Sequence, residues 1–171
     1  DDYYYDLDMQ PVQWAGYYGM HRDYDGNGWN NRITYLDRNG QPVLCSSGYA
    51  INEYKRDEEG NVIGEFYFDI QGNPTKSLLG ECGQLYKRDE NGRINQITYL
   101  DSDGNAKTNS AGYTILKRTY YRDGNINTDM YFDKVGNPVA LSKGQYGIKY
   151  SGKIMLLLNK NGHAMLCLDN I

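Results

Sequence analysis

Apolar and polar residues alternate along short segments of the chain, and the pattern returns every 32 residues. The segments 62–68, 94–100 and 126–132 show it most clearly. One set of alternate positions is mainly apolar, and the other is more polar yet carries a tyrosine in every copy. Side chains of a strand alternate between two faces, so this pattern predicts β-strands. We expect the apolar face to form the core and the other face to be partly solvated, with a ladder of tyrosines along it.

Four segments align without gaps at this spacing and begin with Tyr35, Tyr67, Tyr99 and Tyr131. An earlier copy begins at Tyr4, and a shorter, diverged copy ends the sequence. We therefore expect one repeat array over 1–171, with the approximate repeats 4–34, 35–66, 67–98, 99–130 and 131–156 and a partial repeat 157–171. The sequence starts and stops within repeat-like segments, which indicates a fragment of a larger protein.

Turn motifs separate the predicted strands. An Asp-x-x-Gly motif follows the tyrosine of most aligned segments, and a second turn lies at 57–60 and 89–92, with a contracted copy at 123–125. A further glycine recurs at Gly48, Gly80, Gly112 and Gly144. Aspartate accepts local backbone N–H bonds, and glycine tolerates positive φ. Two turns per repeat predict an all-β fold of tandem β-hairpins, forming a solenoid, a twisted antiparallel sheet or a sheet folded over itself.

Composition and charge narrow the classes of function. The net charge is −4 and the pI is about 5.1, which argues against nucleic-acid binding, because that needs a basic surface. The longest apolar run is 154–158, too short to cross a bilayer, so we expect no direct membrane insertion. The 18 tyrosines, against 3 phenylalanines and 2 tryptophans, are the unusual feature that a function has to use or explain.

Catalytic and metal-binding motifs are weak in this sequence. The histidines His21 and His163 lie in unrelated repeat positions without a partner at metal-ligand spacing. The Asp-x-Asp-Gly segments at 23–26 and 101–104 place glycine at position 4, whereas an EF-hand loop needs it at position 6. The three cysteines predict small buried thiols rather than a Cys45–Cys167 bridge. We expect a non-catalytic protein without a metal or cofactor.

The tyrosines that recur every 32 residues have two interpretations. A tyrosine offers a flat apolar face and a polar edge, which suits stacking on a sugar ring or an ammonium group. Tyrosine is also a favoured strand residue, and aromatic ladders across strands stabilise sheets by themselves. Binding and structure are both open for the column formed by Tyr35, Tyr67, Tyr99 and Tyr131.

The segment from Tyr35 to Gly40, followed by Gly48-Tyr49, resembles the cell-wall-binding (choline- or glucan-binding) repeat. The segment 54–61 also resembles the tyrosine-aspartate repeats of bacterial surface proteins. Both resemblances imply an extracellular or cell-surface module whose partner is a cell-wall polysaccharide or a teichoic-acid-like or choline-bearing polymer. Ile33 and Ile97 stand where that family has tryptophan, so a glycan is no less expected than choline.

Residue matching to that repeat, together with the tyrosine column, gives six candidate ligand-binding residues. They are Tyr35, Tyr49, Tyr67, Tyr99, Tyr113 and Tyr131. The alternative hypothesis is a structural spacer or protein-interaction array without a small ligand, in which the same tyrosines only hold the sheet together.

Overall fold

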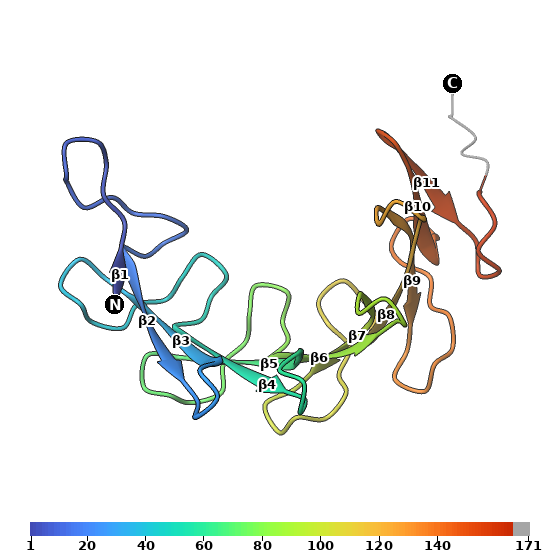
Figure 1. The fold of residues 1–171 in the computed structure, drawn as a ribbon. Helices are drawn as coiled ribbons and strands as arrows, with labels where there is room; N and C mark the ends of the chain where they lie inside the picture. Colours follow the sequence, from blue (N-terminus) through green and yellow to red (C-terminus); the bar gives the residue numbers. More distant parts are fainter. Residues whose placement is uncertain (166–171) are drawn as a thin grey trace. The chain divides into compact units, whose positions relative to one another are not determined.

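The computed structural model describes residues 1–165 and is all-β, with no helix among these residues. Eleven strands follow one another in the sheet in the order in which they occur in the sequence, and the pairs whose register is defined are antiparallel (Figure 1). They are β1 (Asp2–Tyr3), β2 (Gly19–Tyr24), β3 (Asn30–Leu36), β4 (Ile51–Arg56), β5 (Val62–Phe68), β6 (Gly83–Arg88), β7 (Ile94–Leu100), β8 (Ile115–Tyr120), β9 (Ile126–Phe132), β10 (Gly147–Ser151) and β11 (Ile154–Leu158). The predicted all-β fold of tandem hairpins is confirmed.

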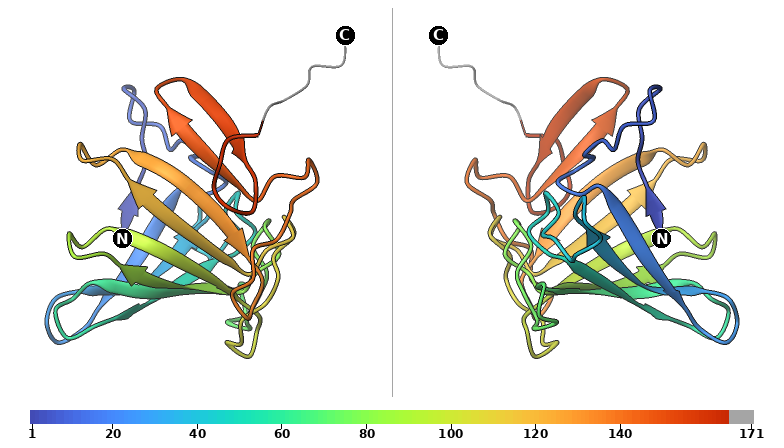
Figure 2. Two further views of the ribbon diagram at one scale, coloured as in Figure 1. Left: turned by 90° about the vertical axis from the view of Figure 1, so that its right-hand side faces the viewer. Right: turned by 90° about the vertical axis from the view of Figure 1, so that its left-hand side faces the viewer.

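The chain divides into two compact units, which are described separately below. The first contains Asp1–Leu85 and Leu100–Asn105, and the second contains Tyr86–Tyr99 and the described residues from Ala106 on. Within each unit the short hairpin turns lie at one end of the strands, and long connections leave from the other end (Figure 2).

The hairpin turns use one local design, illustrated by the turn between β4 and β5. The backbone N–H of Asp57 donates to the Asn61 carbonyl at 3.0 Å, and the N–H of Gly60 donates to the Asp57 carbonyl at 3.1 Å. The Asp57 carboxylate accepts the backbone N–H groups of Glu59 and Asn61 at 3.1 and 2.9 Å. Gly60 has φ +87°, a conformation that disfavours any residue with a Cβ. Aspartate and glycine therefore close the turn together.

The turn between β8 and β9 corrects one detail of the sequence analysis. The segment 123–125 is not a contracted copy, because the turn spans five residues like the others. The N–H of Tyr121 donates to the Asn125 carbonyl at 2.8 Å, and the N–H of Gly124 donates to the Tyr121 carbonyl at 3.0 Å. Tyr121 occupies the position that aspartate holds elsewhere, while Asp123 accepts the Asn125 N–H at 3.0 Å from within the turn. The glycine, rather than the aspartate, therefore keeps the same position in this turn as in the turn between β4 and β5.

The connections between hairpins contain a third turn that the sequence analysis did not assign. After the Asp37 turn, the N–H of Cys45 donates to the Tyr49 carbonyl at 2.8 Å, and the N–H of Gly48 donates to the Cys45 carbonyl at 2.9 Å. Between the two turns, the N–H of Val43 donates to the Tyr35 carbonyl at 3.0 Å. The connection is therefore folded back along the strand that precedes it. The recurring glycines at Gly48, Gly80, Gly112 and Gly144 all have positive φ and mark this turn.

Each unit has a small core in which the tyrosine face of the strands meets the connections. In the first unit, Tyr17, Met20 and Cys45 are buried, with Tyr35 and Val43 among the partly buried residues packed on them. In the second unit the core is formed by buried and partly buried residues of the same kinds. They are Tyr99, Leu116 and Tyr131, with Ile97, Tyr113, Val139, Leu141 and Ile148 around them.

The assignment of faces from the sequence was wrong for the tyrosine positions. Tyr67, Tyr99 and Tyr131 are 4%, 5% and 7% exposed, whereas Phe66 and Met130 on the opposite face are only half-buried. The cause is the third turn, because it brings the connection over the tyrosine face. The alternation along the strands predicted two different surfaces correctly, but it contained no information about which surface the connections cover.

We expect replacement of Asp69 to separate hydrogen bonding from charge in these turns. The backbone N–H of Asn73 lowers the pKa of Asp69, with further help from the Asn73 side chain and the backbone N–H of Gln71. An asparagine can accept the same bonds, as Asn109 and Asn159 do in this protein. Asp69→Ala should therefore lower the melting temperature by a few degrees at pH 7, and Asp69→Asn should lower it less.

The pH dependence gives a second readout of the same pair. Since the folded-state pKa of Asp69 is lowered, its contribution is present above the unfolded pKa of about 3.9 and is lost as the pH falls through the folded value. Thermal melts between neutral and acidic pH should show a shallower acid loss for Asp69→Asn than for the wild type. Equal pH slopes, or equal melting temperatures for the two variants at pH 7, would contradict this role of the turn aspartate.

Candidate functional site

The predicted tyrosines of the first unit lie in one ladder of rings. Tyr17 and Tyr35 have ring centroids 4.6 Å apart, Tyr35 and Tyr49 are 6.0 Å apart, and Tyr49 and Tyr67 are stacked at 4.3 Å with 9° between their planes. Tyr35 and Tyr67 come from strands β3 and β5, whereas Tyr17 and Tyr49 come from the connections. The ladder therefore interleaves two columns of the repeat.

The second unit repeats the arrangement with the other three candidates. The rings of Tyr99 and Tyr113 are 5.4 Å apart and nearly perpendicular, and those of Tyr113 and Tyr131 are 4.7 Å apart. The hydroxyl oxygens of Tyr99 and Tyr113 lie 3.4 Å from each other. All six candidate residues are thus brought into ladders, three in each unit.

Burial gives these rings a low-dielectric environment. Burial raises the pKa of Tyr49 to about 12 and also raises the pKa values of Tyr35 and Tyr131. Tyr67, Tyr99 and Tyr131 are almost completely covered, so their ring faces contact neighbouring side chains. This geometry favours the structural interpretation of the column, and ligand binding by the six tyrosines stays a prediction.

Two of the candidates line a groove on the first unit. Tyr49 and Tyr67 contribute to its wall, and its volume is about 260 Å³. The remaining lining residues are Ser47, Ser77, Leu78, Leu79, Glu81 and Gln84. Sequence reasoning missed Glu81, although a comparison of the residues that follow the recurring glycines contained the signal. At a spacing of 32 residues, these positions hold Tyr17, Tyr49, Glu81, Tyr113 and Gln145.

A second groove of the first unit lies between the tips of the β2–β3 and β4–β5 hairpins and has a volume of about 480 Å³. Its residues combine aromatic rings with carboxylates and amides. They are Asp25, Asn27, Trp29, Asn31, Tyr54, Arg56, Asp57 and Glu58. The Arg56 guanidinium donates to the Asn30 carbonyl at 2.6 Å and to the Gly60 carbonyl at 2.7 Å, which ties the two hairpins together. Trp29 packs so closely on Gly60 that a Cβ there would lie 2.6 Å from the indole.

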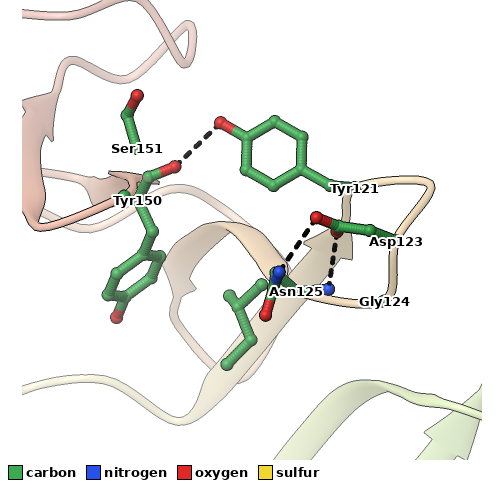
Figure 3. A pocket seen from close by; sticks show the side chains of 8 residues that line it. Tyr121, Asp123, Gly124, Asn125, Tyr150 and Ser151 are labelled. Atoms are coloured by element: carbon green, nitrogen blue, oxygen red, sulfur yellow. Dashed lines mark hydrogen bonds between the residues drawn. The ribbon is translucent and has the colours of Figure 1, made fainter.

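A groove of the second unit lies between the tips of the β8–β9 and β10–β11 hairpins and has a volume of about 800 Å³ (Figure 3). The Tyr121 hydroxyl donates to the Tyr150 carbonyl at 2.8 Å across it. The Asp123 carboxylate accepts the backbone and side-chain N–H groups of Asn125 at 3.0 and 2.9 Å. Gly124, Ile126, Ser151 and Gly152 complete the lining.

The two hairpin-tip grooves occupy matched positions of the repeat, three repeats apart. Tyr54 of the first corresponds to Tyr150 of the second, and Trp29 corresponds to Asn125. Within the second unit, the Arg93 guanidinium, next to the β6–β7 turn, lies 4.6 Å over the ring of Tyr120 at the end of β8. Each groove thus presents a tyrosine beside aspartate and asparagine, while the matched lining positions other than Tyr54 and Tyr150 hold different residues.

The histidine and aspartate motifs singled out in the sequence have local roles in the structure. The Asp101 carboxylate accepts the backbone N–H groups of Asp103 and Asn105 at 3.0 and 2.9 Å, as a hairpin turn requires. His21 lies 2.7 Å from Asp1 and 3.1 Å from Asp23 on an exposed strand. Residues 1–165 hold no group of three or more histidine, cysteine, aspartate or glutamate side chains that could bind a metal ion.

The cysteines are only partly covered by the structure. Cys45 and Cys82 are buried, and Cys45 belongs to the core of the first unit. Cys167, and with it the question of a Cys45–Cys167 bridge, lies outside the described residues.

Comparison with known proteins finds no family model and no curated protein that matches this chain. In the part of the chain that the structure describes, there is no helix of the length and apolar character needed to cross a membrane.

We expect truncation of a ladder tyrosine to destabilise the unit that contains it. Tyr99→Ala removes a 5% exposed ring that contacts Tyr113, and should lower the free energy of unfolding by about 3–5 kcal/mol. Tyr99→Phe keeps the ring and should cost no more than about 1.5 kcal/mol. Urea denaturation, with hydrogen exchange to localise the loss in the second unit, measures both. A Tyr99→Ala protein as stable as the wild type would show that the ladder does not hold the sheet.

Proposed function

We propose that this protein is a non-catalytic binding module that holds an extended glycan in the grooves between neighbouring hairpin tips. The observation that carries the proposal is the occurrence of two amphipathic grooves at matched repeat positions, each with a tyrosine beside carboxylate and amide groups. A sugar ring offers apolar C–H faces and a belt of hydroxyls, which aromatic rings and Asp/Asn side chains complement.

Charge supports a neutral glycan over a phosphate-containing polymer. Asp25, Asp57 and Glu58 line the first hairpin-tip groove, Asp123 lines the second, and the chain carries a net charge of −4. These carboxylates would repel the phosphates of a teichoic-acid-like polymer. A cell-wall polysaccharide, the partner implied by the resemblance of the repeat, fits the grooves better. That resemblance is also the basis for proposing an extracellular or cell-surface location.

Repetition explains how shallow grooves could serve such a ligand. A single open groove with one or two rings supports only weak binding, but a polymer that reaches several grooves gains avidity from its length. Affinity should therefore rise steeply with the degree of polymerisation of the glycan, while monosaccharides bind in the millimolar range or more weakly.

The test is a titration of neutral glucan and N-acetylglucosamine oligomers, with teichoic acid and choline as comparison ligands. Trp29 lines the first groove, so its fluorescence and the amide NMR signals of both hairpin tips report binding. Tyr54→Leu and Tyr150→Leu keep apolar volume but remove the flat ring, and each should weaken oligomer binding by roughly three- to tenfold. Tyr5→Leu, at a ring that is 51% exposed and outside the grooves, is the matched control.

The outcomes of this titration are distinct. Binding that depends on Tyr54 and Tyr150 and not on Tyr5 supports the proposal, provided that the variants melt like the wild type. Binding that follows choline or teichoic acid, with no effect of the two groove variants, would reject a glycan at the hairpin tips. No response to any polymer would reject the binding function as a whole.

A second candidate is a structural spacer or protein-interaction array, and the burial of the tyrosine column favours it. Tyr67, Tyr99 and Tyr131 are each at most 7% exposed, so the most repeated residue of the chain is used for packing. If this is the whole function, the wild type and the Tyr54 and Tyr150 variants should all give flat ligand titrations, while Tyr99→Ala still destabilises the second unit.

A further inference from the structure

The groove lined by Tyr49 and Tyr67 contains an exception to the repeat. Its position after the recurring glycine holds Tyr49 and Tyr113 in the neighbouring repeats but Glu81 here. A carboxylate therefore lies next to the tyrosine ladder at a position where the other repeats have a tyrosine ring or a glutamine amide. This substitution is not required by the turn, because the turn uses only the backbone of Glu81, whose carbonyl accepts the Ser77 N–H at 2.8 Å.

The Glu81 carboxylate is buried, and one of its two oxygens lacks a hydrogen-bond partner. The residue is 2% exposed, and its Oε2 atom has no hydrogen-bond partner. Its Oε1 atom accepts only a long bond of 3.4 Å from the Gln84 side-chain amide. No lysine or arginine is among the described residues that line the groove. A buried carboxylate costs several kcal/mol unless a cation or several donors satisfy it, so this group favours a positively charged partner.

The surroundings of Glu81 match an ammonium group on an alkyl stem. Tyr49 and Tyr67 are stacked at 4.3 Å beside it, and aromatic rings attract cations as well as apolar chains. Leu78 and Leu79 are 75% and 49% exposed on the same turn and provide apolar contacts for methylene groups. The N–H of Leu78 donates to the Ser47 carbonyl at 3.0 Å, which holds the two turns on either side of the groove together.

We propose that the groove formed by Tyr49, Tyr67, Leu78 and Glu81 binds an unbranched primary ammonium group, of the kind that a lysine side chain of a partner peptide carries. The unpartnered Glu81 oxygen needs an N–H donor, which a primary ammonium has and a quaternary ammonium lacks. The site is separate from the hairpin-tip grooves, and it goes beyond the proposed glycan binding.

The experiment follows the amide NMR signals of residues 77–84 in the complete chain during titration with small amines. n-Butylammonium and Nα-acetyl-lysine methylamide should both shift these signals and saturate in the millimolar range. Tetramethylammonium, which cannot donate to Glu81, should bind at least about tenfold more weakly. Glucosamine tests whether the amine has to be on an alkyl stem, and it should also bind at least about tenfold more weakly.

Variants separate the carboxylate from the fold. Glu81→Gln keeps the shape and removes the charge, and Glu81→Tyr restores the residue of the matched repeats; both should lose at least about tenfold in affinity for n-butylammonium. Glu90→Gln removes an equal charge from an exposed turn and is the matched control. Leu78→Ala alters an exposed side chain, so it leaves the fold intact and should weaken binding by a few-fold even if the Glu81 variants do not fold.

Several results would overturn the proposal. The first is the absence of any shift at 77–84 with either alkylamine at concentrations up to about 0.1 M. The second is that tetramethylammonium or glucosamine binds with the same affinity as n-butylammonium. The third is that Glu81→Gln or Leu78→Ala binds n-butylammonium with the affinity of the wild type. None of these results bears on the hairpin-tip grooves, so the glycan proposal is tested independently.

Discussion

The packing of the connections on the tyrosine face of the strands is the interaction on which the rest of this structure depends. A two-stranded hairpin is marginal in water, because it cannot bury either face alone. Here each long connection contains two turns and is folded back along the preceding strand, and two of the connections supply a ring, Tyr49 or Tyr113, that lies between two strand tyrosines. Strand and connection together form a core that neither could form separately.

This constraint also limits where a ligand can bind. A ring that lies between two other rings has little free surface, so the buried tyrosines stabilise the sheet and other side chains have to meet a partner. Among the described residues, grooves remain open at the hairpin tips, where Tyr54 and Tyr150 lie beside aspartate and asparagine, and at Glu81. At the tips the turn glycines keep the backbone compact, and the residues around them differ between the two grooves. At Glu81 a carboxylate replaces the tyrosine that packs in the ladder at the matched positions Tyr49 and Tyr113.

The sequence predicted the strands, the repeat length and the hairpin turns, because alternation and glycine spacing are local signals. It did not predict which face is buried, because Tyr67 and Phe66 are both aromatic residues of the same strand. Their burial differs because the connections cover the face of Tyr67, and the local pattern does not show this. The Asp123 turn was misjudged for a related reason: its five-residue length is maintained by Gly124, with Tyr121 in place of the usual aspartate. Glu81 was visible only by comparing the residues that follow the recurring glycines, since burial of a carboxylate leaves no local mark in a sequence.

An alkaline titration of tyrosinate absorbance, recorded together with circular dichroism, tests the central packing claim most directly. Burial raises the pKa values of Tyr17 and Tyr49 to about 12, so the native state loses stability as the pH rises above the ordinary tyrosine pKa of about 10 and toward these values. The packing described here requires that the buried tyrosines, Tyr17 and Tyr49 among them, ionise only as the sheet unfolds. Ionisation of all 18 tyrosines near pH 10, with the circular dichroism unchanged, would contradict it.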